Sequence, residues 1–312
     1  MTLPPLNSVQ PDLGGSPGWD KPQLNDLLTL TPGDGGALRS SHAEVNANGA
    51  IYGGQLIGQA ITAAAHDILP GMNAHSLQLN FLAPGKTTED LQFEVKRLLQ
   101  GRSFIVQHVL CLQSGRPVFS AHVSFHCGEL GPDFAQPMPQ GVPPPEALPT
   151  VRELVLAHAD EMGLSEAARQ RMGNSRNLEM RPVNGRELLL ERQPAGRWQY
   201  WIRASQPLPA LQTAHQAALG YLTDYWLPIA AMAPHLARKI NSGLYIASLN
   251  HTLWFYAPLD ANDWMLVDAQ SQHTGNGRGL TQGHIYSRDG RALAKVLQET
   301  LFRGWSQQAA TS

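Results

Sequence analysis

Hydrophobic and polar residues alternate with a period of two along many segments of the chain, and two longer segments are apolar on nearly all sides. The alternating segments are bounded by Gly, Asp or Asn, so we expect them to be strands joined by hairpin turns. The two apolar segments, 53–66 and 215–232, have helical length. A helix that is apolar all round is normally surrounded by other elements. The pattern therefore predicts antiparallel sheets that each enclose a helix.

The pattern of strands occurs twice along the chain. The segment HSLQLNFLAPG at 75–85 matches SLNHTLWFYAPL at 248–259, and in both an alternating run ends in aromatic residues followed by Ala-Pro. Phe81 and Phe255 are 174 positions apart. A repeat of this kind decides the architecture before any single motif does.

A second pair of segments keeps almost the same offset. SGRPVFSAHVSFH at 114–126 matches DGRALAKVLQETLF at 289–302, and the glycines of the two turns are 175 positions apart. The alternating segments 36–45 and 196–205 are expected to supply the first strand of each unit. A helix followed by an antiparallel sheet, twice, predicts an α+β fold with two tandem units. A single mixed domain with both helices as core packing is the alternative.

Composition divides the chain further. The segment 128–150 is rich in Pro and Gly and predicts an extended linker, and 151–172 has a helical pattern. We therefore expect an N-terminal unit at 24–127, a linker with a helix at 128–176, and a C-terminal unit that carries the catalytic groups at 177–304.

The composition excludes several classes of function. The 312 residues are 42% hydrophobic and 15% charged with a net charge of -2, and no Lys/Arg cluster would bind nucleic acid. The N-terminus lacks the pattern of a secretory signal, and no stretch of about 18 apolar residues would span a membrane, so we expect a cytoplasmic protein. Cys111 and Cys127 are too few for a disulfide framework and show no zinc pattern with histidine. No metal or cofactor is expected.

Asp224 stands out because it lies in the apolar segment ALGYLTDYWLPIAA. A buried carboxylate without a partner costs several kcal/mol. Pro228 follows four residues later, so the helix is expected to end or kink there, which would leave Asp224 near a helix C-terminus with a raised pKa. Partners must come from strands of the same unit, and Ser248 and Gln298 are the candidates. An acid, a hydroxyl and an amide that converge would hold and polarise one water molecule.

Seven blocks of sequence carry a resemblance to a known family. They are YGGQLIGQA, HSLQLNFLAPG, GRSFIVQHVLCLQSGRPVF, HQAALGYLTDYWL, IASLNHTLWFYAP, GRGLTQGHIYSRDGRALA and VLQETLFR. In their order and spacing, from about Leu24 to Arg303, the chain resembles the acyl-CoA thioesterase II family. The resemblance implies a double hotdog fold, in which two units pair their sheets side by side. It also implies hydrolysis of medium- or long-chain fatty acyl-CoA to free fatty acid and CoA.

The resemblance also implies roles for individual residues. Members of the family use an Asp, a Thr or Ser hydroxyl and a Gln to orient a water molecule, and the intervals of 24 and 50 residues place Asp224, Ser248 and Gln298 on these positions. Ser248 stands where Thr is usual and keeps the hydroxyl. A thioester has a good leaving group, so a well-placed water needs neither a serine nucleophile nor a metal.

The start of the first helix supplies the candidates for substrate binding. Gly53 and Gly54 permit close backbone approach and are expected to line an equivalent pocket in the first unit, with Gln55 and His75 as further binding residues. Gln55 is equally explained as a polar residue at a helix start, and His75 as a packed or hydrogen-bonded side chain. Val123 stands near the position of Gln298 in the first unit, which argues against catalysis there.

The chain departs from the family pattern at several positions. Ala83, Gln107 and Ala257 stand where arginines are common, and Asn250 stands where Asp often precedes His251. These changes predict altered affinity for CoA or altered assembly. Two alternatives remain: a non-catalytic acyl-CoA binding or regulatory module on the same fold, and an acyl-CoA hydratase, whose D-x-N-x-x-H segment is missing. The sheet edges lead us to expect a homo-oligomer, either a dimer or a tetramer.

Overall fold

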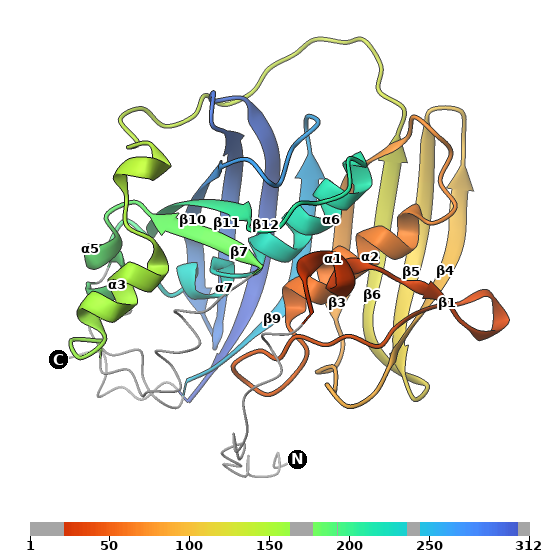
Figure 1. The fold of residues 1–312 in the computed structure, drawn as a ribbon, viewed down its shortest axis with the longest axis horizontal. Helices are drawn as coiled ribbons and strands as arrows, with labels where there is room; N and C mark the ends of the chain where they lie inside the picture. The colour runs from red at the N-terminus through yellow and green to blue at the C-terminus, as the bar shows by residue number, and fades with distance from the viewer. Residues whose placement is uncertain (1–21, 163–176, 192, 236–243, 305–312) are drawn as a thin grey trace.

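The computed structural model describes residues 22–162, 177–191, 193–235 and 244–304 of the chain. Within these residues, twelve strands form one antiparallel sheet in the order β1-β2-β4-β5-β6-β3-β9-β12-β11-β10-β8-β7. The helices α1, α2 and α6 lie together in front of the sheet, over its middle (Figure 1). The sheet therefore has two halves of six strands, and each half comes from one half of the chain.

The strands of the N-terminal half are β1 (Thr31–Pro32), β2 (Leu38–Ser40), β3 (Asn73–Phe81), β4 (Leu91–Gln100), β5 (Phe104–Gln113) and β6 (Arg116–His126). Those of the C-terminal half are β7 (Leu178–Pro182), β8 (Arg197–Ala204), β9 (Tyr245–Phe255), β10 (Met265–Gly275), β11 (Arg278–Ser287) and β12 (Ala292–Arg303). The helices are α1 (Leu24–Leu28), α2 (Gly53–Ala65), α3 (Val151–His158), α5 (Gly185–Leu190), α6 (Gln212–Thr223) and α7 (Leu227–Ala230), with short 3₁₀ turns at Asp34–Gly36 and Pro145–Ala147.

The two halves join through β3 and β9, which pair antiparallel over five residues from Ser76 to Asn80. On either side of this seam, β6 pairs with β3 and β12 pairs with β9. The two units therefore meet through the equivalent strand of each, in agreement with the sequence repeat.

The central helices α2 and α6 pack against one another as well as against the sheet. A Cβ atom on Gly58 would lie 2.7 Å from the carbonyl oxygen of Ala217, and one on Gly220 would lie 2.9 Å from Cγ2 of Ile57. Glycine at both positions lets the two backbones approach closely. The expectation that each sheet encloses only its own helix was therefore incomplete, since the two helices form one shared layer.

The helix predicted at 215–232 is two helices. Helix α6 ends at Thr223, Asp224 is its C-terminal cap, and α7 begins at Leu227. Pro228 lies in the first turn of α7, where its missing N–H costs nothing. The break that Pro228 predicted is confirmed, and it leaves the side chain of Asp224 beyond the last turn of α6.

The Pro-rich segment after β6 is not a free spacer. It runs along the top of the sheet from β6 toward α3 (Figure 1). The Nε1–H of Trp201 donates to the carbonyl of Pro143 at 2.9 Å. Three apolar side chains of the segment pack on a small cluster of the C-terminal half, and they are Met138, Val142 and Leu148.

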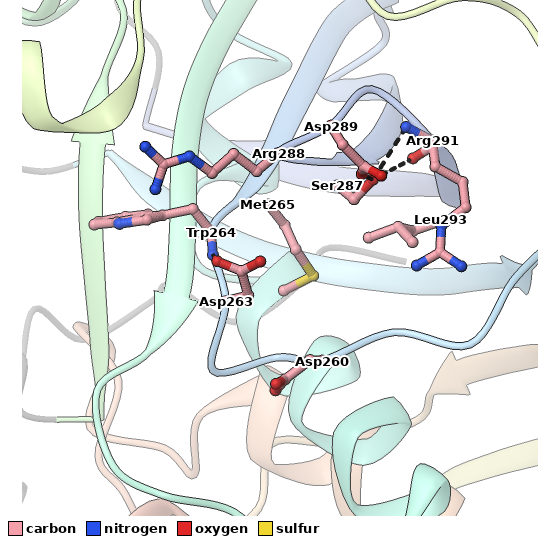
Figure 2. A pocket seen from close by; sticks show the side chains of 9 residues that line it. All are labelled: Asp260, Asp263, Trp264, Met265, Ser287, Arg288, Asp289, Arg291 and Leu293. Atoms are coloured by element: carbon pink, nitrogen blue, oxygen red, sulfur yellow. Dashed lines mark hydrogen bonds between the residues drawn. The ribbon is translucent and has the colours of Figure 1, made fainter.

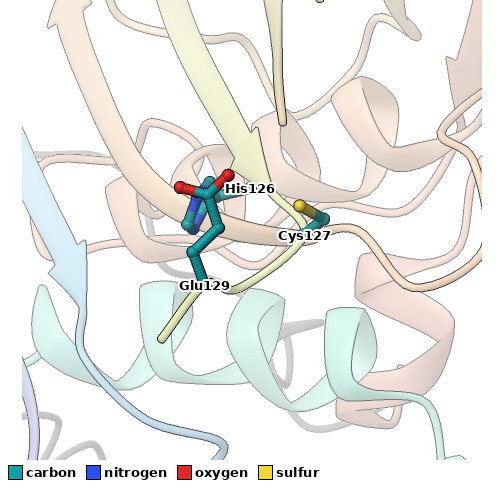
Figure 3. A group of neighbouring side chains, drawn as sticks. All are labelled: His126, Cys127 and Glu129. Carbon is teal, nitrogen blue, oxygen red and sulfur yellow. The ribbon is translucent and has the colours of Figure 1, made fainter. Parts of the chain in front are cut away.

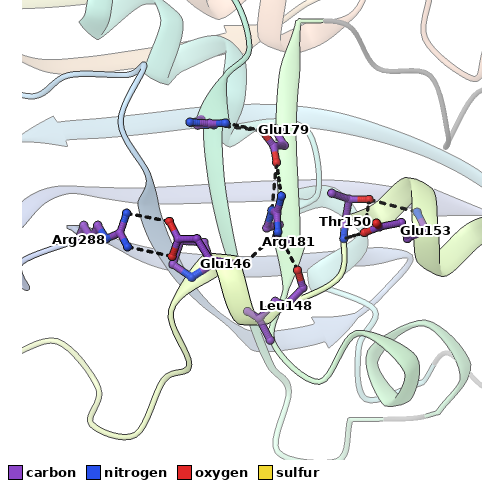
Figure 4. A network of polar contacts seen from close by, with 9 residues as sticks. Glu146, Leu148, Thr150, Glu153, Glu179, Arg181 and Arg288 are labelled. Atoms are coloured by element: carbon purple, nitrogen blue, oxygen red, sulfur yellow. Dashed lines mark hydrogen bonds and ion pairs between the residues drawn. The ribbon is translucent and has the colours of Figure 1, made fainter.

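Polar contacts hold the end of the same segment (Figure 4). Arg181 on β7 donates to the carbonyl oxygens of Pro145 and Leu148 at 3.2 and 2.9 Å. Helix α3 then starts with a capping box between Thr150 and Glu153. It ends at His158, and residues 163–172 of the helix predicted at 151–172 lie outside the described residues.

No helix among the described residues combines the length and the hydropathy that crossing a bilayer would need.

Candidate active site

Asp224, Ser248 and Gln298 meet at the end of α6, although 74 residues separate the first from the last. The hydroxyl of Ser248 on β9 donates to Oδ1 of Asp224 at 2.8 Å. Nε2 of Gln298 on β12 donates to the same oxygen at 2.8 Å and lies 2.6 Å from Oγ of Ser248. The structure thus brings together the three side chains that the sequence singled out.

Asp224 is buried, with 4% of its surface exposed, and Gln298 is completely buried. Desolvation raises the pKa of Asp224 to about 6, against the lowering effect of hydrogen bonds from Ser248, Gln298 and the backbone of Gly54. A carboxylate with this pKa is ionised at neutral pH and still a stronger base than an exposed aspartate. The site therefore offers a general base that is already oriented.

The start of α2 completes this site. A Cβ atom on Gly53 would lie 2.6 Å from Oδ2 of Asp224, and one on Gly54 would lie 2.4 Å from the carbonyl oxygen of Tyr221. The backbone of Gly54 also lowers the pKa of the Asp224 carboxyl group. We expected these glycines to line a separate pocket in the first unit. The structure instead places them beside Asp224, because the packing of α2 on α6 brings the start of one helix against the end of the other. Their role in substrate binding stays a prediction.

A cavity of about 820 Å³ opens beside Asp224 and Ser248. Its walls come from both units, and most of the large side chains are apolar or aromatic, among them Leu56, Phe81, Tyr225, Ile229, Ile246 and Leu249. Such a cavity suits an extended apolar ligand with a polar reacting group at one end. The carboxylate lies at the wall, where it can reach a bound molecule.

Glu44 is a second carboxyl group in the wall of this cavity. The hydroxyl of Tyr221 donates to its Oε2 at 2.7 Å. Desolvation raises the pKa of Glu44 to about 7. Sequence reasoning missed this residue, because no motif in the surrounding SSHAEVN indicates that its carboxylate would be buried.

Gln55 does not line the cavity. It is buried, its Oε1 accepts from the N–H of Glu44 at 2.8 Å, and its Nε2 donates to the carbonyl of His42 at 2.7 Å. The structure therefore makes it an anchor for the segment that carries Glu44. We expected Gln55 to contact the substrate, and the structure shows that it binds the backbone of Glu44 and His42 instead.

His75 also lies outside the lining of the cavity. Its Nε2 is 2.8 Å from Oγ of Ser124, and its ring lies edge-on to those of Phe104 and His126. These contacts place it at the end of β3, among residues of β5 and β6. The structure does not bring it to the three catalytic candidates.

The first unit has no polar group at the position of Gln298. Val123 faces Leu77 across β6 and β3, as Gln298 faces His251 across β12 and β9. Both residues of the first pair are buried and apolar. The described part of the N-terminal unit therefore offers an apolar pair where the C-terminal unit offers a histidine and an amide.

Comparison with known proteins identifies the family of this chain. The model of the acyl-CoA thioesterase N-terminal domain matches residues 41–126, and the model of the C-terminal domain matches residues 145–302. The chain belongs to the acyl-CoA thioesterase II family. Its members are hydrolases of thioesters, so the chain is an enzyme of this class.

Two curated relatives cover most of the chain. Acyl-coenzyme A thioesterase 8 of Homo sapiens is 30% identical over 299 residues, which is 94% of this chain and 92% of the relative. Acyl-CoA thioesterase 2 of Haemophilus influenzae is 30% identical over 259 residues, which is 81% of this chain and 87% of the relative. The similarity thus extends through both units.

Solved structures confirm the predicted double hotdog fold. The acyl-CoA thioesterase II TesB2 of Mycobacterium marinum has a TM-score of 0.72 and 30% identity, and covers 91% of this chain and 99% of its own. A hot dog fold protein from Alicyclobacillus acidocaldarius has a TM-score of 0.72 at 20% identity, covering 91% and 98%, and it supports the fold alone.

Ala83 and Gln107, two positions at which the resemblance implies arginine, have different surroundings. Ala83 lines the cavity, whereas Gln107 is buried within β5. Asn250 accepts from the N–H of Glu299 at 3.1 Å, which ties β9 to β12. Arg303, at the end of β12, provides a positive charge in the wall of the cavity. A cation is therefore present at the cavity although the position of Ala83 offers none.

A second hollow, of about 410 Å³, lies near the hairpin between β11 and β12 (Figure 2). Asp260, Asp263, Arg288, Asp289 and Arg291 contribute charges to its wall. The hydroxyl of Ser287 binds Asp289 and the backbone of Arg291 within the hairpin. This polar wall suits a fatty acyl chain less well than the larger cavity.

His126, Cys127 and Glu129 form a cluster of metal-ligand types at the end of β6 (Figure 3). The N–H of Gly128 donates to Nδ1 of His126 at 3.3 Å, so the hydrogen of a neutral ring lies on Nε2, which faces Glu129 at 3.7 Å. Ser103 already donates to the other carboxylate oxygen. At 3.7 Å the His126 and Glu129 side chains are in electrostatic contact only, and Nε2 of His126 has no hydrogen-bond partner among the described residues.

Proposed function

We propose that this protein hydrolyses medium- and long-chain fatty acyl-CoA to free fatty acid and CoA, with a water molecule oriented by Asp224, Ser248 and Gln298. The observation that carries the proposal is that Oδ1 of Asp224 accepts from both Ser248 and Gln298 at the wall of a large apolar cavity. A polar group of three side chains in an apolar wall marks the place where a polar reaction centre would lie.

The hydrogen bonds leave defined atoms free for the water. Ser248 donates to Asp224 and accepts from Gln298, so its oxygen keeps one lone pair. A water that donates one hydrogen to Asp224 and the other to Ser248 would have its own lone pair directed into the cavity. Such a water is held in attack geometry, which lowers the entropic part of the barrier.

Each proton and electron pair in the reaction has a destination. The water oxygen bonds to the thioester carbonyl carbon while Asp224 takes a proton from the water. The carbon–sulfur bond then breaks, the sulfur leaves with the electron pair, and the resulting thiolate takes up the proton that Asp224 holds, which returns Asp224 to its ionised form. The N–H of Gly53, at the uncapped start of α2, is the donor we propose for the developing oxyanion.

The cavity also suggests how the substrate lies. Its apolar wall suits the acyl chain, and Arg303 is placed to attract the phosphates of CoA. Ala83, at the position of a family arginine, offers no such charge. We therefore expect apolar contacts with the acyl chain to supply more of the binding free energy than contacts with the CoA phosphates.

The test is release of free thiol from acyl-CoA of several chain lengths, followed with a thiol dye. Asp224→Asn should lower kcat by roughly 100-fold or more, since general-base catalysis typically contributes 10²–10⁴-fold. Ser248→Ala should lower kcat, and Ser248→Thr should retain it because the hydroxyl remains. Asp260→Asn is the matched control, because Asp260 is exposed and lies outside the cavity.

The outcomes separate the candidate functions. Full turnover by Asp224→Asn would remove the proposed mechanism. Tight binding of acyl-CoA without release of thiol from the wild type would favour a binding or regulatory module. Addition of water to an enoyl-CoA would favour a hydratase.

We also propose a cytoplasmic homo-oligomer. Both cysteines are free, which suits a reducing compartment. Strand β4 pairs with β2 only from Leu91 to Phe93, and beyond that Val95, Leu98 and Leu99 are exposed. Apolar side chains on a partly unpaired strand favour association with a second chain. Light scattering on the purified protein measures the state.

A further inference from the structure

His251 connects Gln298 to a side chain outside the catalytic group. The two residues face one another across β9 and β12, and Nδ1 of His251 is 2.8 Å from Oε1 of Gln298. Nε2 of the same ring is 3.1 Å from Oγ1 of Thr223. All three side chains are buried, so their polar atoms must find partners within the protein.

The charge on Asp224 fixes the direction of each hydrogen bond in this chain of contacts. An ionised carboxylate only accepts, so the end of Gln298 that faces Asp224 must be the NH₂ group. Oε1 of Gln298 then faces His251, and Nδ1 must carry a hydrogen. In a neutral ring Nε2 is therefore an acceptor, and it takes the hydroxyl hydrogen of Thr223.

The other arrangements each bring two acceptors together. A flipped amide would place Oε1 of Gln298 about where Nε2 lies, 2.8 Å from the carboxylate of Asp224. The other tautomer of His251 would place the lone pair of Nδ1 against Oε1 at 2.8 Å. Burial lowers the pKa of His251 to about 4, so the doubly protonated ring is absent at neutral pH. One tautomer and one amide orientation satisfy both contacts of the His251 ring, and the Thr223 hydroxyl, which also lies 3.2 Å from the carbonyl oxygen of Gly220, then donates to Nε2 in place of that carbonyl.

We propose that His251, protonated on Nδ1 and accepting from Thr223 through Nε2, is a positioning residue that holds the amide of Gln298 in its catalytic orientation. It does not line the cavity and acts only through Gln298. The kinetic consequence rests on the proposed thioesterase activity, whereas the tautomer and the amide orientation do not. The first unit has Leu77 at this position, opposite Val123, and so lacks both partners.

Four variants separate positioning from packing. His251→Asn places an NH₂ donor where Nδ1 lies, and His251→Leu keeps volume without a donor. Thr223→Val removes the hydroxyl with little change of shape. Thr281→Val is the matched control, because Thr281 is buried and faces Gln298 from β11, but its hydroxyl has no partner in the described structure.

Kinetics give the first readout. His251→Leu should lower kcat roughly 10- to 100-fold with KM within about threefold, since a small misplacement of a catalytic group costs rates of this order. His251→Asn should restore most of kcat, and Thr223→Val should lower it by a smaller factor. Thr281→Val should leave it unchanged. Equal losses in His251→Leu and His251→Asn, or no loss in either, would overturn the proposal.

Nitrogen NMR of histidine-labelled protein gives a readout independent of activity. The signals missing from His251→Asn assign the ring of His251, and in the wild type they should show a protonated Nδ1 and an unprotonated Nε2. Thr223→Val should shift the Nε2 signal. A wild-type ring protonated on Nε2 contradicts the inference even if thiol release is normal. Absence of thiol release with the expected tautomer instead contradicts only the proposed function.

Discussion

A Cβ atom on Gly53 would lie 2.6 Å from Oδ2 of Asp224. The first residue of α2 therefore lies against the C-terminal cap of α6, and the proposed catalytic carboxylate of the C-terminal unit meets a glycine of the N-terminal unit. Two units that each fold well would still lack a complete site without this contact. The proposed site therefore lies where the two units meet.

Gly53→Ala should abolish most of the thioesterase activity while the protein stays folded. The new methyl group would meet the flexible carboxyl group of Asp224, which can move away from Ser248 and Gln298, so kcat should fall roughly 100-fold. Gly54→Ala would instead meet the backbone of Tyr221 at 2.4 Å, where neither side can yield. That variant should lose stability, which thermal unfolding measures.

Gly131→Ala is the control for both glycine variants, since nothing lies within 4 Å of a Cβ atom there. It should keep both the activity and the unfolding temperature of the wild type. A fully active Gly53→Ala enzyme would show that the carboxylate does not need its present position.

The activity should fall below pH 6. Asp224 must be ionised to accept a proton, and burial raises its pKa to about 6. We therefore expect kcat/KM to decrease tenfold per pH unit below that value and to level off above it. If Asp224 is responsible, the acidic fall of kcat/KM should occur at the same pH in Glu44→Gln. It should also stay at the same pH in His251→Asn, because the His251 ring is neutral near pH 6. A change in the pH of this fall in either variant would assign the ionisation to another group.

The two-unit fold could be predicted from the sequence because the same alternation of apolar and polar positions occurs in both halves of the chain. The offset of 174 residues between Phe81 and Phe255 anticipates that β3 and β9 are equivalent strands, and the structure shows that they meet at the seam. Asp224 was found because a carboxylate in an apolar helix must have a partner.

Contacts between the units could not be predicted in the same way. The approach of Gly53 to Asp224 depends on how α2 packs on α6, which no periodic pattern encodes. Strand β7 was missed because it contains an ion-pairing Glu179 and Arg181 and ends in Pro182. The contact between His251 and Gln298 emerges only when the register of β9 and β12 is known.

Glu44→Gln should stabilise the protein at alkaline pH. Burial raises the pKa of Glu44 from 4.5 to about 7, so the folded state holds a proton that the unfolded state releases. The stability that this proton confers is complete below about pH 4.5 and is lost as the pH rises through about 7. Glutamine cannot ionise and still accepts from Tyr221, so the variant should gain roughly 2–3 kcal/mol at pH 8.5.

Urea unfolding at pH 5 and pH 8.5 measures this gain for Glu44→Gln. The variant should match the wild type more closely at pH 5 than at pH 8.5. Glu94→Gln, on the exposed part of β4, should change the free energy of unfolding by the same amount at pH 5 and at pH 8.5. A Glu44→Gln gain that is the same at both pH values would mean that burial of the charge is not its cause.

Glu179→Ala should destabilise the C-terminal unit without changing KM. Glu179 accepts from Arg181 at 2.8 Å (Figure 4) and from Arg203 at 2.7 Å. Both guanidinium groups lie over the ring of Trp264. Glu179 and its two arginines are half-buried, and Arg181 also binds the backbone of the linker. Loss of the Glu179 carboxylate should therefore lower the free energy of unfolding by roughly 1–2 kcal/mol. Glu146→Ala, which breaks an exposed pair with Arg288, should change the free energy of unfolding much less. Equal losses in urea unfolding would show that the network behaves as ordinary surface pairs, and a raised KM would connect it to the cavity.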